Sequence, residues 1–513
     1  MTGPLSLRDP RLFAAATLLA VLPLWLTPYL PLVDAPQHAA QVASLHELLR
    51  GNPVFTADLE INWFTPYLVG YLLLFAVSSV LPIVVATKVV LSAALIAFPW
   101  VTGLVLRELG TDERLKWLAI PGSYSVAFYW GFVVYVVAIP IALALLVLTI
   151  RFERDPSLRR GIGIAAFSVL LFFCHVMALG FVALACLTYL VGRNLGSPQR
   201  LLRLMLPYTA PLPIIALWMT RILGTEASVQ NAPTVFGGFR AHLTTLFSQL
   251  SGLDGIAFAA SLPIAATILL LPFATGHRFS AKPERWLPLT VGVVVYFLFP
   301  SFAQNTAFLY ERLGVFLIPL WLMAWDPPAN KGRAFGVVTL AILALWSGVN
   351  LVRFALFGSS MNQFDVVLKA AEPGRHLAGM LVCNASPYFT NPVYLHFAAW
   401  YQAVGLGIAD MSFAITHPSP VRYRDMKQPR FGEFLAWNPT AFSWSRDAGD
   451  SYDYFLVCAG ADLADVLFKD RQASVTLVAQ QGPWWLYRNV TRVQQLESAS
   501  PVPRPLSEHE QGP

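Results

Sequence analysis

Charged residues are scarce in this sequence: they make up 12% of its 513 residues, whereas 56% are hydrophobic. The mean hydropathy is +0.57. This composition excludes a soluble protein of this length and predicts a chain that lives in a bilayer. A hydrocarbon core of about 30 Å needs about 20 helical residues. Uncharged runs that meet or approach this length occupy residues 12–33, 61–87, 89–106, 117–150, 161–192, 204–220, 255–276, 286–310 and 334–352.

Several motifs of soluble enzymes and pumps are missing as well. The sequence has no GxxxxGK(S/T), which argues against an ATP-driven pump, and no HExxH, CxxC pair or GxSxG. Its four cysteines do not make a disulfide framework. Cys174 and Cys186 lie in an uncharged run, whereas Cys383 and Cys458 lie in the more polar C-terminal part. The last two could pair if that part is extracytoplasmic.

The formal net charge of +6 does not indicate a nucleic-acid-binding protein, because the basic residues lie in short loops between apolar runs. By contrast, residues 31–62 contain a single Lys or Arg, Arg50. Cytoplasmic loops are enriched in Lys and Arg, so we expect the N-terminus inside and the first loop and the C-terminal part outside. The basic loops are residues 151–160, 193–203, 277–285 and 331–333.

This orientation leads to eleven predicted spans. The first run, 12–33, is longer than the apolar region of a signal peptide and lacks a clear small-x-small cleavage site, so we expect it to be retained. Residues 161–192 have to cross twice, as two short helices that meet near His175, because the arginine clusters that flank them are on one side. Between residues 61 and 150 there are four apolar segments, but the predicted orientation requires three crossings of the membrane. One of them is therefore expected to be re-entrant or peripheral.

The pattern changes near residue 359, which divides the chain into three predicted regions. Residues 1–358 form a polytopic transmembrane domain with a first outer loop at 31–63, residues 359–493 a small extracytoplasmic α/β domain, and residues 494–513 a disordered tail. The fold class is thus an α-helical polytopic membrane protein with a C-terminal α/β domain. Its expected elements are an interfacial helix at 239–250, a helix at 365–371, strands at 378–383 and 454–458, and a hairpin of 474–479 with 484–488.

The first outer loop carries the strongest candidate for chemistry. Asp34 follows the first span, and His38 comes four residues later, near enough to share a site if a turn and a helix start join them. The Asp34 carboxylate could act as general base toward an acceptor hydroxyl or amine, or could bind a divalent metal ion together with His38. Asp34 also fits an N-cap ahead of Pro36, and the two roles can coexist.

These residues carry a resemblance to a known superfamily. A first span, an outer loop that opens with an acidic residue, many further spans and a soluble outer C-terminal domain together resemble the GT-C superfamily of polyprenyl-phosphate-dependent membrane glycosyltransferases, which includes protein mannosyltransferases and aminoarabinose transferases. The segment from Asp34 to His38 also looks like the Asp-x-Pro-x-His loop of bacterial membrane proteins grouped with it. The commoner motif has adjacent acidic residues, whereas Ala35 follows Asp34. Asp58 and Glu60 could supply a second carboxylate, although solvated surface roles suit them better.

The resemblance implies a donor with a lipid phosphate, whose phosphate needs a cation at the outer boundary of the membrane. Arg312 meets that need, because it lies in a predicted helix at 305–325 and its guanidinium fork matches phosphate oxygens. The alternative is an ion pair with Glu311, but helix neighbours point about 100° apart. Glu311, at a depth where charges are costly, joins Arg312 as a candidate for substrate binding. His175 is a third candidate, with a hydrogen-bonded packing role as the alternative.

The predicted function is the transfer of a sugar from a polyprenyl-phosphate donor to an acceptor at the outer face of a bacterial inner membrane. Asp34 would deprotonate the acceptor, His38 would orient it or bind metal, and Arg312 would hold the donor phosphate. A secondary transporter or flippase for a lipid-linked substrate is the alternative, although no internal repeat is visible and the charges cluster toward one side. A noncatalytic assembly partner is a third reading. The sequence indicates neither the sugar, lipid and acceptor nor the oligomeric state.

Overall fold

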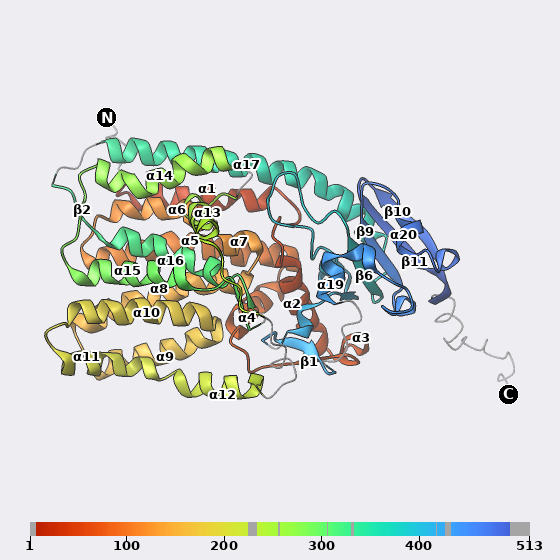
Figure 1. Cartoon of the computed structure of the whole chain (residues 1–513), viewed down its shortest axis with the longest axis horizontal. Coiled ribbons are helices and arrows are strands. Elements are labelled where there is room, and N and C mark those ends of the chain that lie inside the picture. Colours follow the sequence, from red (N-terminus) through yellow and green to blue (C-terminus); the bar gives the residue numbers. More distant parts are fainter. Residues whose placement is uncertain are drawn as a thin grey trace, which may run out of the picture.

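The chain folds into a helical bundle and a C-terminal domain built on a mixed sheet, and both parts lie along one long axis (Figure 1). The computed structural model describes residues 7–223, 233–254, 257–304, 306–329, 333–416, 418–425 and 432–492. Residues 494–513, for which a disordered tail is predicted, lie outside the described residues. The apolar bundle makes the chain an integral membrane protein.

The long helices of the bundle run side by side along its axis (Figure 1). In the described part of the chain, four of them (α5, α8, α10 and α17) are long and apolar enough to span a bilayer. A fifth span results if α11 and α12 are taken as one segment that bends by 42°. The count of eleven spans therefore stays a prediction. The helices are α1 (Pro10–Val21), α4 (Leu68–Ser78), α5 (Ile83–Leu109), α8 (Val133–Arg154), α9 (Leu158–Cys174), α10 (Val176–Arg193), α11 (Pro198–Met205), α12 (Leu212–Leu223), α14 (Phe258–Ala274), α15 (Pro283–Leu298), α16 (Leu309–Met323) and α17 (Ala334–Lys369).

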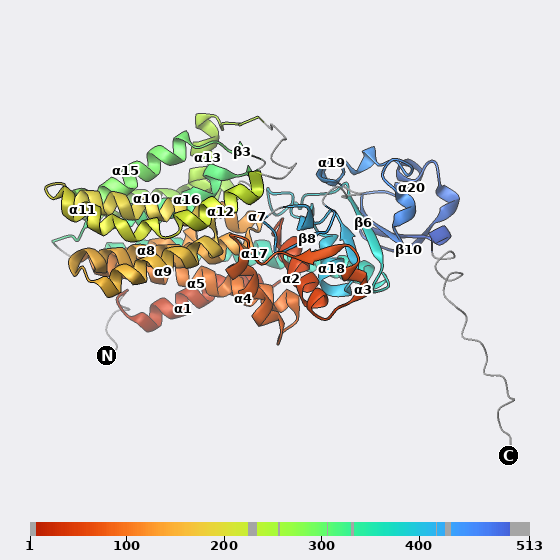
Figure 2. The same ribbon diagram turned by 90° about the horizontal axis from the view of Figure 1, so that it is seen from below.

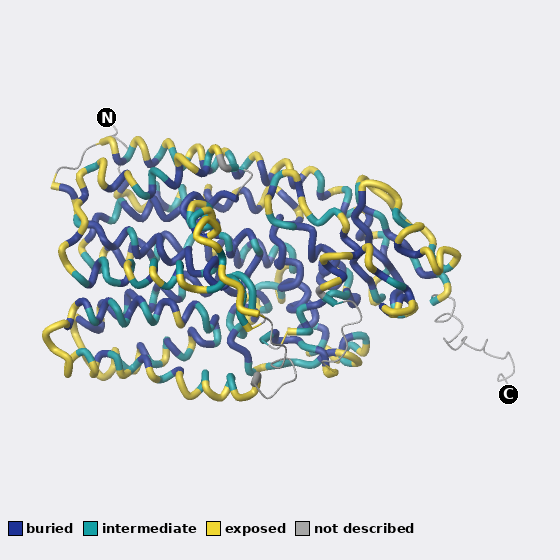
Figure 3. The backbone as a smooth tube through the Cα atoms, in the orientation of Figure 1, coloured by how far each residue is buried: buried dark blue, intermediate teal, exposed yellow. Residues whose placement is uncertain are grey.

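Helix α8 forms the centre of the bundle and α17 lies at its edge. In the most apolar stretch of each helix, 83% of the residues are buried in α8 but only 28% in α17. Figure 3 shows the exposed segments of the bundle along its outer helices, including α17 and α12. Apolar side chains that face outward at these positions suit contact with lipid.

The helix break predicted near His175 is confirmed. Helices α9 and α10 are separated by His175 alone, whose backbone is extended and whose Nδ1 accepts a hydrogen bond from the backbone N–H of Met177 (3.3 Å). Between residues 61 and 150, α4 has only 11 residues and is too short to cross a core of about 30 Å at 1.5 Å per residue. The stretch before α8 is also broken, into the short helices α6 (Ala119–Gly122) and α7 (Val126–Trp130).

The basic loops at 151–160, 193–203 and 277–285 lie at one end of the bundle, opposite to the C-terminal domain (Figure 1). There Glu108, at the end of α5, pairs with Arg151 (2.7 Å) and Arg154 (2.8 Å) at the end of α8. Arg193, at the end of α10, pairs with Glu153 and with Glu284 at the start of α15, both at 3.2 Å. This common end is the arrangement that the positive-inside pattern predicts.

Helix α17 joins the bundle to the C-terminal domain. Its 36 residues make a rod of about 54 Å, and the predicted boundary between residues 358 and 359 falls inside it. The helix expected at 365–371 is its last part. The domain beyond contains a five-stranded sheet in the order β10-β11-β9-β6-β7, in which β6 is parallel to β7 and β9. The strands are β6 (His376–Leu381), β7 (Ile408–Asp410), β9 (Tyr454–Cys458), β10 (Val475–Gln481) and β11 (Trp484–Asn489).

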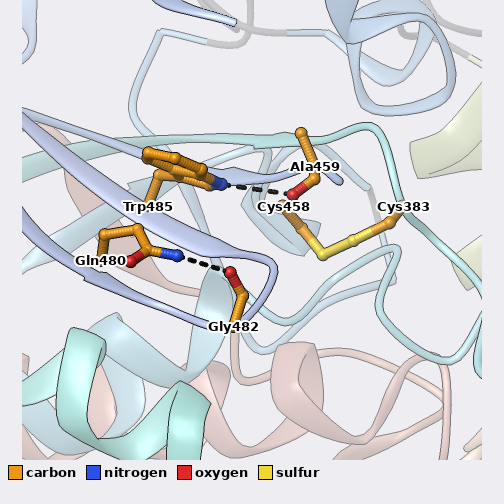
Figure 4. The surroundings of a disulfide bond; sticks show 6 residues. All are labelled: Cys383, Cys458, Ala459, Gln480, Gly482 and Trp485. Carbon is orange, nitrogen blue, oxygen red and sulfur yellow. Dashed lines mark hydrogen bonds between the residues drawn. A yellow bond between two sulfur atoms is a disulfide. The ribbon is translucent and has the colours of Figure 1, made fainter. Parts of the chain in front are cut away.

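The structure confirms the predicted strands of the C-terminal domain and shows that Cys383 and Cys458, whose pairing the sequence left open, are joined. The expected strands and hairpin correspond to β6, β9, β10 and β11, with Gly482 in the turn at a φ of +58°. Cys383 and Cys458 form a disulfide with a Cα–Cα distance of 5.3 Å, which links the ends of β6 and β9 (Figure 4). Trp485 donates from Nε1 to the carbonyl of Ala459 beside it (3.2 Å). The disulfide therefore fixes the point at which the chain leaves β6.

The first outer loop lies against the C-terminal domain (Figure 2). It contains α2 (Ala35–Leu49), α3 (Pro53–Thr56) and β1 (Leu59–Ile61). Strand β1 pairs antiparallel with β8 (Val421–Tyr423), with Glu60 opposite Arg422. The Glu60 carboxylate binds the Arg422 guanidinium at 2.7 Å, whereas Asp58 is exposed. The sequence did not predict this pairing, because two three-residue strands carry no recognisable periodicity.

Candidate functional site

Asp34 lies at the end of the bundle that meets the C-terminal domain. It is 6% exposed, and its Oδ1 lies 3.0 Å from Nδ1 of His396, which is 8% exposed. Asp34 occupies the N-cap position of α2, yet its side chain makes no capping hydrogen bond. The capping alternative is therefore wrong for the side chain. The carboxylate is turned to His396 instead, and Oδ2 accepts no hydrogen bond from any residue that the structure describes.

The backbone around Asp34 depends on Gly131 in the turn between α7 and α8. The N–H of Asp34 donates to the carbonyl of Trp130 at 2.9 Å. Gly131 has a φ of +85°, and a Cβ there would lie 2.7 Å from the nitrogen of Asp34 and 2.8 Å from that of Ala35. Because a side chain would be strained and would also clash, only glycine lets this turn approach the start of α2 so closely.

His38 lies one helical turn beyond Asp34 and points into the bundle. Its Nδ1 forms a hydrogen bond with the hydroxyl of Tyr71 in α4 (2.8 Å). Burial lowers the pKa of His38 to about 4. The negative charge of Asp34 opposes this shift, whereas the neighbouring Arg312 and His396 add to it. His38 is therefore a neutral polar group near pH 7 rather than a cation.

The lowered pKa of His38 leads to a testable dependence of stability on pH. In the unfolded chain His38 takes up a proton near pH 6.5, but in the folded protein only near pH 4, so the unfolded state binds more protons between these values. The free energy of unfolding contributed by this group is thus lost as pH falls from 6.5 to 4. We expect His38→Asn, whose amide can keep the contact to Tyr71, to lose less stability than the wild type on going from pH 7.5 to pH 4.5. The expected difference is on the order of 2 kcal/mol.

Thermal unfolding of the wild type and His38→Asn in the same detergent, at pH 7.5 and at pH 4.5, checks this. Gln37→Asn cannot replace His38→Asn in this test, because it leaves the imidazole of His38 in place. Equal losses of stability in wild type and His38→Asn would show that His38 titrates at an ordinary pH in the folded protein.

His175 and Arg312 lie close to each other, and the charge of Arg312 also acts on His38. Tyr67 packs on the His175 ring with a centroid distance of 4.6 Å, and Tyr135 contacts it edge-on at 4.7 Å. The Tyr135 hydroxyl donates to the backbone carbonyl of Arg312 (2.7 Å). Met177 connects the same two residues, because its N–H bonds His175 and its sulfur lies 3.6 Å from Nη1 of Arg312.

Arg312 presents a guanidinium without an acidic partner. It lies in the first turn of α16, which begins at Leu309 rather than near residue 305, so Arg312 is closer to the helix end than predicted. The guanidinium stacks 4.0 Å above the ring of Phe132, and its Nε is buried with no hydrogen-bond partner. No carboxylate of the described residues lies within salt-bridge distance of it. A half-buried cation in this state is suited to an anionic ligand.

Glu311 points away from Arg312, as the spacing of helix neighbours predicted. Its Oε1 accepts a hydrogen bond from the Ser301 hydroxyl (2.5 Å), and its backbone carbonyl accepts one from Gln249 (2.7 Å). Within the part of the chain that the structure describes, Glu311 forms no hydrogen bond with Asp34 or His38. The structure thus brings Asp34, His38, His175 and Arg312 into one region and leaves Glu311 at its margin.

The described side chains around Asp34 do not form a ligand set for the divalent metal ion that the sequence left open. Asp34 Oδ1 and His38 Nδ1 are both engaged with other side chains. Among the described residues, no three His, Cys, Asp or Glu side chains lie close enough to hold a metal ion. Because the residues present do not make up a ligand set, no step proposed below runs through a metal.

Sequence reasoning missed His396 and Tyr71, which contact the two central residues of the site. His396 is 362 positions from Asp34, and it follows a loop whose composition carries no motif. Tyr71 lies in a short apolar helix, where an aromatic residue indicates packing. The available signal was weak: His396 is one of nine histidines, and it lies in the part of the chain predicted to be outside.

Comparison with known proteins identifies the fold of the chain. No protein-family model matches the chain, and no curated protein sequence matches it either. Among solved structures, ArnT from Cupriavidus metallidurans in the apo state is similar over 94% of this chain and 98% of ArnT, with 12% sequence identity and a TM-score of 0.53. The structure of the same protein bound to undecaprenyl phosphate covers the same shares, with 13% identity and a TM-score of 0.50.

Arabinofuranosyltransferase AftD from Mycobacteria is similar over 95% of this chain but only 42% of its own, with a TM-score of 0.49, and adds nothing to the fold assignment. The likeness to ArnT covers the bundle and the C-terminal domain together. Over nearly the whole length of both proteins, this chain has the fold of ArnT.

Proposed function

We propose that this protein is a membrane glycosyltransferase that moves a sugar from a polyprenyl-phosphate donor to an acceptor at the outer face of a bacterial inner membrane. The observation that supports the proposal is that two charges act on the neutral His38: a carboxylate with an available oxygen, Asp34, and a guanidinium without an acidic partner among the described residues, Arg312. A base and an anion-binding cation in one region are what transfer from a phosphate-linked donor requires.

The fold supports the same class of donor. ArnT, whose fold this chain has, is known in a structure with bound undecaprenyl phosphate. Arg312 in the first turn of α16 would hold the donor phosphate with its forked N–H groups, because guanidinium and phosphate match in charge and geometry. The α16 N-terminus adds a favourable field for an anion at that place.

The reaction would be an inverting transfer. The acceptor oxygen or nitrogen attacks the anomeric carbon and forms the new glycosidic bond, while the bond from that carbon to the phosphate oxygen breaks and polyprenyl phosphate leaves with the electron pair. The acceptor's proton passes to Oδ2 of Asp34. His38, held by Tyr71, would orient the acceptor through its free ring nitrogen. His175 would support Arg312 through Met177 rather than touch the substrate.

The test separates a transferase from a transporter or flippase. Membrane vesicles that contain the protein are given synthetic polyprenyl phosphates, each linked to a radiolabelled pentose or hexose. We expect at least one label to appear in a covalent product that lipid solvents do not extract as donor, with release of polyprenyl phosphate. Movement of an intact labelled donor across the vesicle membrane without cleavage of the sugar–phosphate bond would identify a transporter instead. Vesicles from cells without the protein are the control.

A further inference from the structure

Helix α2 presents one polar face to the C-terminal domain along most of its length. Its contacts recur at helical spacing, starting at Asp34. Gln37 donates to the carbonyl of Met411 (2.7 Å) and accepts from the N–H of Phe413 (3.0 Å). Further along, the Gln41 side chain accepts from the N–H of Val421 (3.0 Å), and Ser44 accepts from Gln402 (2.6 Å). Positions 34, 37, 41 and 44 lie on one side of a helix. The C-terminal domain is therefore fitted to the helix that carries Asp34.

The segment that delivers His396 is held at several points before it reaches Asp34. The disulfide of Cys383 fixes its start at the end of β6. In its middle, the N–H of Thr390 donates to Oδ2 of Asp254 (2.8 Å), and Asp254 forms a buried ion pair with Arg353 of α17. Arg353 also donates from Nε to the carbonyl of Tyr388 (3.0 Å). At its end, α18 (Ala399–Gly405) packs along α2.

The His396 ring is thus placed by neighbours that do not touch Asp34. It packs edge-on against Phe413 with a centroid distance of 5.5 Å, and the same Phe413 ring contacts His38 at 5.8 Å. A ring so fixed presents Nδ1 to Oδ1 of Asp34 and leaves Oδ2 without a partner among the described residues. One oxygen of the carboxylate is anchored and the other is available.

We propose that His396 is the positioning residue of the proposed base, so that the C-terminal domain completes the active site of the bundle. His396 donates from Nδ1–H to Oδ1 of Asp34 and thereby aims Oδ2 at the acceptor. A charge-assisted hydrogen bond of this kind both orients an anion and stabilises it relative to its protonated form. This inference rests on the proposed function, in which Asp34 is the base, and assigns to His396 the role of holding the Asp34 carboxylate.

The chain offers a matched set of substitutions at one position. In His396→Asn the side-chain amide nitrogen is as many bonds from the backbone as Nδ1, so the donor to Asp34 is retained. In His396→Gln the amide nitrogen instead takes the place of Nε2, and in His396→Ala the donor is lost. We expect the transfer kcat to fall about 10- to 100-fold in His396→Gln and His396→Ala, with a KM for the donor within about twofold of wild type. We expect His396→Asn to stay within about fivefold of wild-type kcat.

A second readout does not need transfer. A hydrophobic carbodiimide reacts with protonated carboxyl groups, so loss of the donor should raise the labelling of Asp34, measured by peptide mass spectrometry of the full-length protein in membranes. We expect labelling at pH 6.5 to rise severalfold in His396→Gln and His396→Ala and to match wild type in His396→Asn. Asp34→Asn gives the background.

The outcomes separate the two proposals. If wild type transfers no sugar, the proposed function fails, and the labelling series still decides whether His396 holds the carboxylate. If wild type transfers sugar but all three variants keep its kcat and its labelling, the positioning role of His396 is overturned and the function stands. A loss of kcat in His396→Asn equal to that in His396→Ala would also overturn it, because the donor alone would not restore function.

Discussion

Transfer activity is expected to fall by about 10²- to 10⁴-fold when Asp34 is replaced by asparagine, the range that a general base contributes. The amide keeps the size of the side chain and can still contact His396, but its oxygen cannot accept the acceptor's proton. The effect should appear in kcat, with a much smaller change in the KM for the donor, because the base acts on the acceptor in the transition state. Initial rates of label transfer in membrane vesicles, at matched protein levels, measure it.

The matched control is Asp58→Asn, which removes a carboxylate from the same outer loop. Asp58 is exposed, so its loss should leave kcat within about twofold of wild type. If Asp34→Asn retains full activity while the wild type is active, Asp34 has no part in the proton transfer, and the site around it has another purpose.

The second large effect is expected at Arg312. Arg312→Gln should lower kcat/KM for the polyprenyl-phosphate donor by about 100-fold or more, because two charge-assisted hydrogen bonds to phosphate are lost. Arg312→Lys keeps the charge but not the forked geometry, so it should recover only part of the activity. Binding of undecaprenyl phosphate alone, measured with the purified protein in nanodiscs, should weaken in the same order.

Arg221→Gln serves as the control for charge near the outer end of the bundle. Arg221 is exposed and lies 4.5 Å above the ring of Phe64, so it is a cation on an aromatic ring like Arg312 but outside the site. Equal losses of donor binding in Arg312→Gln and Arg221→Gln would mean that general surface charge, and not a phosphate site at Arg312, attracts the donor.

The parts of the fold that sequence could predict are those encoded by neighbours in the chain. The break at His175 follows from the basic loops at the two ends of one apolar run, which have to lie on the same side of the membrane. The hairpin of β10 and β11 follows from two alternating strands and a turn with Gly482. By contrast, β1 and β8 pair although the whole bundle separates them in sequence. A three-residue strand also has no pattern of its own.

The same division applies to the candidate site. Asp34 and His38 were visible because they share one loop, and Arg312 because a charge in an apolar run is costly. The depth of Arg312 was misjudged because the short strands β3 (Phe302–Ala303) and β4 (Thr306–Ala307) replace the first turns of the expected helix. His396 could not be found, since only tertiary structure brings it to Asp34. The same contact decides that the Asp34 side chain does not cap α2.

The distance in sequence between Asp34 and its partner has a consequence for biogenesis. A ribosome that adds about 5 to 20 residues per second needs roughly 20 to 70 s to go from Asp34 to His396, a separation of 362 residues. During that time the first loop has left the ribosome without the domain that covers it. Under the proposal made above, the Asp34 carboxylate therefore lacks its positioning residue until the last third of the chain has been made, and a chain released before His396 is made never acquires it.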